Sequence, residues 1–343
     1  MIVMGIETSC DETSVAIIEQ KKTDGFGYVL AENTLSQVNK HNKFGGIVPE
    51  LASREHEKTL NFLVKKTLSE ANINLKKIDA FAATTGPGLL GGLLIGSNYA
   101  KTLSLANNKP FLSVNHLQGH ILITRMNQKI RFPFLSLLLS GGHTQLLVVK
   151  AYNKFEIIGE TLDDALGEAF DKTAKLLGYG YPGGPIIEKL ALKEKSKNFF
   201  KLPKPLLNSK NLDFSFSGLK TSIRKIAEKP LNKSLKCKLA NEFQECITEI
   251  LLTKCEKAIN LTKKEMDISS FVLAGGVASN KFIREKFNLL CDKHSIEFIV
   301  PKKNLCVDNA TMIAWAGIER LKKKKSSDPV NEHPRPRWSV ENL

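Results

Sequence analysis

The fold is decided by two similar stretches that lie far apart, residues 2–18 (IVMGIETSCDETSVAII) and residues 134–149 (FLSLLLSGGHTQLLVV). In each stretch an apolar run leads into a short turn of small and polar residues, and a second apolar run follows. This pattern is typical of a strand, a tight turn and a second strand. A hairpin that opens each half of the chain indicates two related α/β lobes, although two unrelated hairpins would give the same pattern.

The rest of the chain alternates between strand and helix patterns. Short apolar runs that end in glycine-rich turns predict buried strands, and longer periodic segments predict helices. We expect strands at 78–84 and 268–274, and helices at 89–105, 239–259 and 280–288. The second lobe would begin near residue 131, which gives lobes of residues 1–130 and 131–343.

Length and composition fit an ordinary two-domain globular protein. The chain has 343 residues, of which 42% are hydrophobic and 25% are charged. The uncharged stretch 80–100 holds five glycines and a proline, which argues against a membrane-spanning helix. The N-terminus has no basic region typical of a signal peptide, and the six cysteines include no CxxC pair. We therefore expect a cytoplasmic protein without a membrane segment.

The net charge of +15 is concentrated in one segment. Residues 189–238 contain fourteen basic and three acidic residues, with phenylalanines interleaved at 199, 200, 214 and 216. Basic and aromatic residues together are common in surfaces that bind RNA. A solvated lysine-rich helical insertion with inward phenylalanines would give the same composition. The basic tail, residues 322–343, is expected to be extended or mobile.

Two histidines have the spacing of metal ligands. His116 and His120 are separated by four positions, which on a helix places both imidazoles on one face, about 6 Å apart. The zinc-protease motif HExxH requires a glutamate after the first histidine, and Leu117 stands there instead. Histidine pairs are often merely hydrogen-bonded, so a metal site requires a third ligand. A carboxylate in that role would favour Fe(II).

Three glycine-rich turns follow apolar strands, at 86–88, 140–142 and 275–276. Glycine lets backbone N–H groups approach phosphates, so three such turns in an α/β chain indicate a nucleotide site. None of them matches a Walker A or a GxGxxG motif. Several carboxylates lie in turns or beside glycines, and their spacing alone does not show which of them come together in the fold. They are Asp11, Glu12, Asp163, Asp164, Glu168, Asp171 and Asp308.

Several motifs, in order along nearly the whole chain, resemble those of the TsaD family of tRNA threonylcarbamoyl-adenosine transferases. They occupy residues 5–13 (GIETSCDET), 116–120 (HLQGH), 140–145 (SGGHTQ), 168–174 (EAFDKTA), 181–185 (YPGGP), 213–220 (DFSFSGLK), 274–277 (AGGV) and 336–338 (PRW). The resemblance implies an α/β fold of two ribonuclease-H-like lobes of the actin, Hsp70 and sugar-kinase type, with a nucleotide and metal cleft between them. It also implies transfer of threonylcarbamoyl from threonylcarbamoyl-AMP to N6 of adenosine 37 in tRNAs that read ANN codons, with release of AMP.

The resemblance further implies roles for individual residues. His116, His120 and Asp308 would bind one divalent metal, with Fe(II) first and Zn(II) second. The family often has aspartate where this chain has Glu188, so that contact would be made through a longer side chain. The general base has no clear counterpart, and Asp11 and Glu12 are candidates. The residues implied to contact the substrate are Leu138, Leu139, Ser140, Gly141, Gly142, Asp171, Gly184, Glu188 and Asn280.

The family also implies partners, and the sequence allows other functions. In bacteria TsaD works with a TsaB-like protein and a TsaE-like ATPase, and receives its substrate from a TsaC-type synthase. A small-molecule kinase on the same fold is one alternative, although such enzymes usually carry aspartate where this chain has Glu7. A non-enzymatic scaffold is another. The older glycoprotease interpretation is disfavoured because Leu117 replaces the catalytic glutamate.

Overall fold

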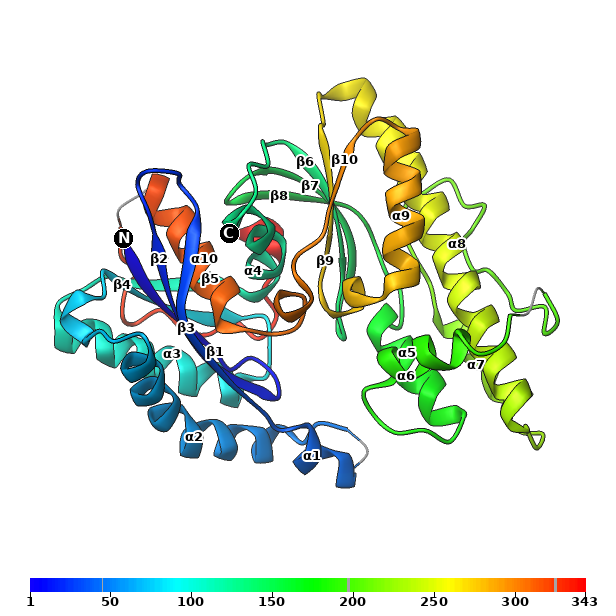
Figure 1. Ribbon diagram of the computed structural model, residues 1–343, viewed down its shortest axis with the longest axis horizontal. Coiled ribbons are helices and arrows are strands. Elements are labelled where there is room, and N and C mark those ends of the chain that lie inside the picture. Colours follow the sequence, from blue (N-terminus) through cyan, green and yellow to red (C-terminus); the bar gives the residue numbers. More distant parts are fainter. Residues whose placement is uncertain (45, 196–197, 324–325) are drawn as a thin grey trace. The chain divides into compact units, whose positions relative to one another are not determined.

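The computed structural model describes residues 1–44, 46–195, 198–323 and 326–343, which form two compact units. The first unit comprises residues 1–130, 151–155 and 301–343. The second unit comprises residues 131–150 and 156–300. Each unit is built on its own five-stranded sheet (Figure 1).

The sheet of the first unit has the strand order β3-β2-β1-β4-β5. The three strands at one side form an antiparallel meander, and β4 and β5 continue the sheet in parallel with β1. The strands are β1 (Ile2–Glu7), β2 (Glu12–Gln20), β3 (Gly27–Ser36), β4 (Ala80–Gly86) and β5 (Phe111–Asn115). The helices are α1 (Val38–His41), α2 (Pro49–Glu70), α3 (Leu90–Asn107), α4 (His116–Leu122) and α10 (Ala310–Lys323).

Helices cover both faces of this sheet, and β1 shows why (Figure 1). Side chains alternate across a strand. Met4 and Ile6 pack into the core with α2 and α3. Gly5 points to the other face, where a Cβ atom would lie 2.3 Å from the carbonyl oxygen of Ala310. The absence of a side chain at Gly5 therefore lets α10 lie directly on the sheet.

The second unit repeats this strand order as β8-β7-β6-β9-β10. Again β6 and β7 are antiparallel, and β6, β9 and β10 run parallel. The strands are β6 (Phe134–Leu139), β7 (Thr144–Ala151), β8 (Lys154–Glu160), β9 (Ser270–Ala274) and β10 (Glu297–Ile299). The helices are α5 (Leu166–Leu176), α6 (Gly183–Ala191), α7 (Ser217–Ala227), α8 (Lys233–Glu265) and α9 (Lys281–Lys293).

The matching strand orders confirm the prediction of two related lobes from the repeated hairpin. The structure differs from the expected division at the C-terminus. Residues 301–343 belong to the first unit rather than to a lobe of residues 131–343. The physical reason is that α10 packs on β1 and β2, where it buries an almost continuous apolar face.

The lysine-rich segment of residues 189–238 is only partly helical. It contains the end of α6, an irregular stretch, α7 and the start of α8, and its residues 196 and 197 lie outside the described part. Phe214 and Phe216 are fully buried, as an inward-packed insertion requires, whereas 60% of Phe199 is exposed. Among the helices of the described residues, none is both long and apolar enough to cross a membrane.

The basic tail begins within the end of α10, contains a short 3-10 helix at Val340–Asn342, and is otherwise irregular; contacts fix it to the first unit. The backbone N–H of Arg335 donates to the carbonyl of Thr85, and the N–H of Gly88 donates to the carbonyl of Pro336. The indole of Trp338 is buried, and the Arg335 guanidinium stacks on it at 3.5 Å. The part of the tail that follows residue 325 is therefore anchored rather than mobile.

Candidate metal centre

The two histidines lie on α4, at the carboxyl end of β5. Asn115, the last residue of β5, caps this helix because its side-chain oxygen accepts the N–H groups of Leu117 and Gln118 at 2.9 and 3.2 Å. His116 is thus the first residue of the helix and His120 lies one turn later. Both histidines are buried, and their ring centroids are 4.7 Å apart. The predicted placement of the pair on one helix is therefore observed.

Asp308 reaches the histidines from the far end of the chain. It immediately precedes Asn309, whose side chain caps α10 by accepting the N–H of Met312 at 2.8 Å. The N–H of Ala310 donates to the Ser14 hydroxyl on β2 at 3.0 Å. These contacts fix the start of α10, and with it the backbone of Asp308, against the sheet.

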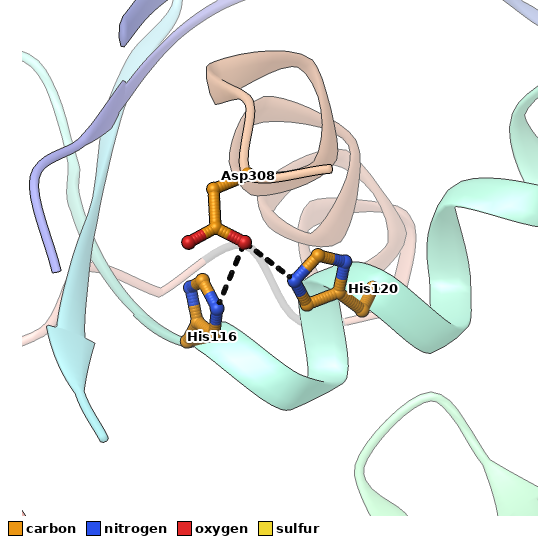
Figure 2. Close-up of side chains that lie close together, drawn as sticks. All are labelled: His116, His120 and Asp308. Carbon is orange, nitrogen blue, oxygen red and sulfur yellow. Dashed lines mark hydrogen bonds and ion pairs between the residues drawn. The ribbon is translucent and has the colours of Figure 1, made fainter. Parts of the chain in front are cut away.

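The three side chains converge on one point (Figure 2). The Nε2 atoms of His116 and His120 lie 3.5 and 3.0 Å from Oδ1 of Asp308. One ligand atom from each residue falls within 4.8 Å of the other two. Two imidazoles and one carboxylate, with other positions left open, form a donor set suited to Fe(II) and also to zinc. The residues therefore fit a single divalent metal.

Electrostatics couple these groups tightly. Burial disfavours the charged form of His116, but the carboxylates of Asp308 and Glu7 outweigh it and hold the pKa of His116 well above its usual range. Burial likewise opposes ionisation of Asp308, yet the two histidines hold its pKa well below the usual range. Without a bound metal, these charges therefore favour the protonated form of the His116 imidazole. A metal cation bound there would displace this proton.

Of the candidate bases, Asp11 ends the turn between β1 and β2 and Glu12 is the first residue of β2, and both lie in the same unit as the cluster. Burial and the nearby charges of Asp308 and Asp11 raise the pKa of Glu12 to about 9. Glu12 therefore holds a proton near neutral pH when no cation is bound. Asp11 is buried, and its Oδ2 atom has no hydrogen-bond partner among the described residues.

The predicted substrate residues at the end of β6 form a tight turn in the second unit. Leu138 and Leu139 end the strand, and the Ser140 hydroxyl accepts the N–H of His143 at 3.1 Å. A Cβ atom at Gly141 or Gly142 would meet open space. Packing within the chain therefore does not explain these two glycines, whereas close approach of a ligand to the backbone would.

The other predicted substrate residues, also in the second unit, join its helices. Asp171 on α5 accepts the N–H of Gly183 at 2.6 Å, directly beside Gly184 in the first turn of α6. Glu188 accepts the N–H of Lys281 at 2.7 Å, at the start of α9. Asn280 caps the same helix by accepting the N–H of Ile283 at 3.1 Å. The longer side chain at position 188 thus contacts the start of α9.

Sequence reasoning missed three residues that support these groups. Glu7 contacts His116, Asn115 caps α4, and Gln244 on α8 accepts a hydrogen bond from the Asn280 amide at 2.9 Å. Asn115 was detectable in principle, because asparagine directly before a helix is a capping signal. The contacts of Glu7 and Gln244 depend on tertiary packing and leave no local signal.

Comparisons with known proteins agree with this architecture. The family model described as "TsaD: tRNA N6-adenosine threonylcarbamoyltransferase" matches residues 28–315. The tRNA N6-adenosine threonylcarbamoyltransferase of Brucella ovis is 47% identical over 99% of this chain and 96% of its own length.

Two solved structures share the fold at low identity. HypF of T. kodakarensis matches with a TM-score of 0.62 and 15% identity, over 94% of this chain and 48% of its own. Component A of the (R)-2-hydroxyglutaryl-CoA dehydratase of Acidaminococcus fermentans matches with a TM-score of 0.52 and 13% identity, over 93% of this chain and 99% of its own.

Proposed function

The chain belongs to the TsaD family of tRNA N6-adenosine threonylcarbamoyltransferases, and on this premise we propose the reaction that it catalyses. The threonylcarbamoyl group passes from threonylcarbamoyl-AMP to N6 of adenosine 37 in tRNAs that read ANN codons. A bond forms between N6 and the carbamoyl carbon, the bond from that carbon to the phosphate oxygen breaks, AMP leaves with that electron pair, and N6 gives up one proton to a base. The product is t6A in the anticodon loop.

The cluster of His116, His120 and Asp308 is the observation that carries this proposal. Its two imidazoles and one carboxylate come from α4 and from the turn before α10, and all three ligand atoms lie within 4.8 Å. We propose that they hold one Fe(II) ion, with Zn(II) as the second choice. When bound, the metal supplies a Lewis acid that polarises the carbamoyl carbonyl and orients the donor.

The remaining chemistry is positioning, because the amine nucleophile belongs to the tRNA. We propose that the turn formed by residues 138–142 contacts the adenylate phosphate or the metal-bound group through its backbone. Two features support this role, the open space at Gly141 and Gly142 and the tight anchoring of the turn by Ser140. Asp171, Gly184, Glu188 and Asn280 would contact the nucleotide. Asp11 and Glu12 remain the candidates for a general base.

The same family membership supports the partners of the reaction. We propose that the chain acts with a TsaB-like and a TsaE-like protein and receives threonylcarbamoyl-AMP from a TsaC-type synthase. The reaction would take place in the cytoplasm, where tRNA is modified. Cys10, Cys237, Cys246, Cys255 and Cys291 are free thiols, which suits a reducing compartment.

The decisive experiment measures transfer of labelled threonylcarbamoyl from threonylcarbamoyl-AMP to unmodified tRNA, with and without the two partner proteins. We expect label at adenosine 37. No transfer with partners and added iron would contradict the proposal. Phosphorylation of a small metabolite by ATP, without dependence on tRNA, would favour a kinase instead.

The metal role is tested by His120→Ala. We expect this variant to lose bound metal and transferase activity together, because one of three ligands is removed. His294→Ala is the matched control, because His294 belongs to the second unit and not to the cluster. Its Nε2 atom lies 3.1 Å from Oε1 of Glu256. A metal-free His120→Ala variant with full activity would show that the metal is not required.

A further inference from the structure

The two ring nitrogens of His116 have different surroundings. Nε2 faces Asp308, as Figure 2 shows. Nδ1 lies on the other side of the ring, 3.0 Å from Oε2 of Glu7 and 3.1 Å from the hydroxyl oxygen of Ser9. A neutral histidine that ligates a metal through one nitrogen carries its proton on the other, so the partner of Nδ1 decides the tautomer.

The Glu7 carboxylate is fixed in place before any metal binds. Glu7 ends β1 and is fully buried. Its Oε1 accepts the backbone N–H of Ser9 at 2.6 Å, and its Oε2 accepts the hydroxyl of Thr84 on β4 at 2.5 Å. Two adjacent parallel strands therefore hold this carboxylate against Nδ1 of His116.

His120 lacks comparable support. Its Nδ1 atom is buried and has no hydrogen-bond partner among the residues that the structure describes. The two histidines are thus unequal although they share a helix and face the same carboxylate. Of the two, His116 alone has a carboxylate at its Nδ1 atom within the described part of the chain.

We propose that Glu7 is a positioning residue of the metal centre. Its carboxylate accepts a hydrogen bond from the protonated Nδ1 of His116, which fixes the ring and directs the Nε2 lone pair towards the ion. It also makes the imidazole a stronger donor. This inference rests on the metal site of the proposed function and adds a residue that does not itself touch the ion.

The test is the affinity of the full-length chain for Co(II), a spectroscopic substitute for Fe(II). Glu7→Gln keeps the size of the side chain but removes its charge, and its amide cannot accept from Ser9, Thr84 and His116 at once. We expect the dissociation constant for Co(II) to rise about 10- to 100-fold, with a shifted visible absorption spectrum. Glu7→Asp should recover part of the affinity, because it restores the charge.

Ser9→Ala is the matched control. It removes the other neighbour of Nδ1 and leaves Glu7 in place, so we expect Co(II) affinity within about threefold of the wild type, well below the effect of losing an outer-sphere carboxylate. A larger loss in Ser9→Ala than in Glu7→Gln would overturn the assignment, because Ser9 would then be the partner that matters. Wild-type affinity and spectrum in a folded Glu7→Gln variant would overturn it as well.

A second measurement covers the case in which Glu7→Gln fails to fold. In the wild-type chain loaded with Zn(II), nitrogen-15 NMR of the histidines should show a protonated Nδ1 and a metal-bound Nε2 at His116. The opposite tautomer would contradict the proposal. Failure of the wild type to bind either Co(II) or Zn(II) would refute the metal site itself, which is distinguishable from failure of Glu7 alone.

Discussion

Asn115 connects the metal-binding helix to the anchored tail, and its replacement is the sharpest test of how the centre is supported. Its side-chain oxygen caps α4, and its amide donates to the carbonyl of Trp338 at 3.1 Å. Asn115→Ala loses a cap worth about 1 kcal/mol. It also removes a buried donor from the Trp338 carbonyl, which costs about 1–3 kcal/mol. We expect the unfolding free energy of the first unit to fall by about 2–4 kcal/mol in total.

The same substitution should weaken metal binding. Helix α4 has only seven residues, so loss of its cap loosens the turn that carries His116 and His120. Asn115→Asp keeps the capping oxygen but replaces the donor to Trp338 by a carboxylate oxygen, so it disrupts the tail contact without removing the cap. We expect Asn115→Asp to lose stability but to bind Co(II) within about threefold of the wild type, since the cap is retained.

Tryptophan fluorescence during denaturant unfolding is the appropriate assay. Both tryptophans of the chain, Trp315 and Trp338, belong to the first unit, so the signal reports on that unit alone. If Asn115→Ala unfolds at the same denaturant concentration as the wild type, the expected loss of stability from the cap and the Trp338 contact is refuted. A lower midpoint with unchanged Co(II) affinity would show that packing against α10, and not the cap, positions the histidines.

Two further predictions concern packing and RNA binding. Gly5→Ala would place a Cβ atom 2.3 Å from a backbone oxygen of α10, so we expect tryptophan fluorescence to show a loss of about 1–3 kcal/mol. Gly119→Ala meets only side-chain atoms at 3.1 and 3.2 Å and a carbonyl at 3.4 Å, and an equal loss there would contradict this explanation. If the lysine-rich segment contacts tRNA, reversing the charge of exposed Lys195 and Lys201 should weaken binding and flatten its salt dependence. Unchanged tRNA binding would show that the lysines of this segment reflect the overall composition of the chain and not a role in binding tRNA.

The sequence predicted those parts of the fold that have a local pattern. The hairpins at 2–18 and 134–149 predicted the repeated lobes, because alternation and turn chemistry act over a few residues. The return of residues 301–343 to the first unit was not predictable in this way. It depends on the complementarity of Gly5 and α10, which are about 300 positions apart in the chain.

The metal centre likewise has residues that local spacing predicts and residues that it does not. The spacing of His116 and His120 placed both rings on one helical face, because helical geometry links positions four apart. Asp308 was one of seven candidate carboxylates, and only the family resemblance identified it as a ligand, since nothing local marks it as one. Glu7 was noted only because small-molecule kinases of this fold usually have aspartate at that position. Its contact with His116 requires β1 and β4 to lie side by side, which the sequence does not encode locally.

These long-range contacts explain why the cluster belongs to the whole first unit rather than to α4. Helix α4 contributes the two imidazoles, the turn before α10 contributes Asp308, and the end of β1 contributes Glu7. An unfolded chain would bring these groups together only at a large entropic cost. A metal that binds this arrangement therefore binds the folded unit, and its binding free energy adds to the stability of that unit. Substitutions that loosen α4 or α10 should consequently lower metal affinity even when they leave every ligand in place.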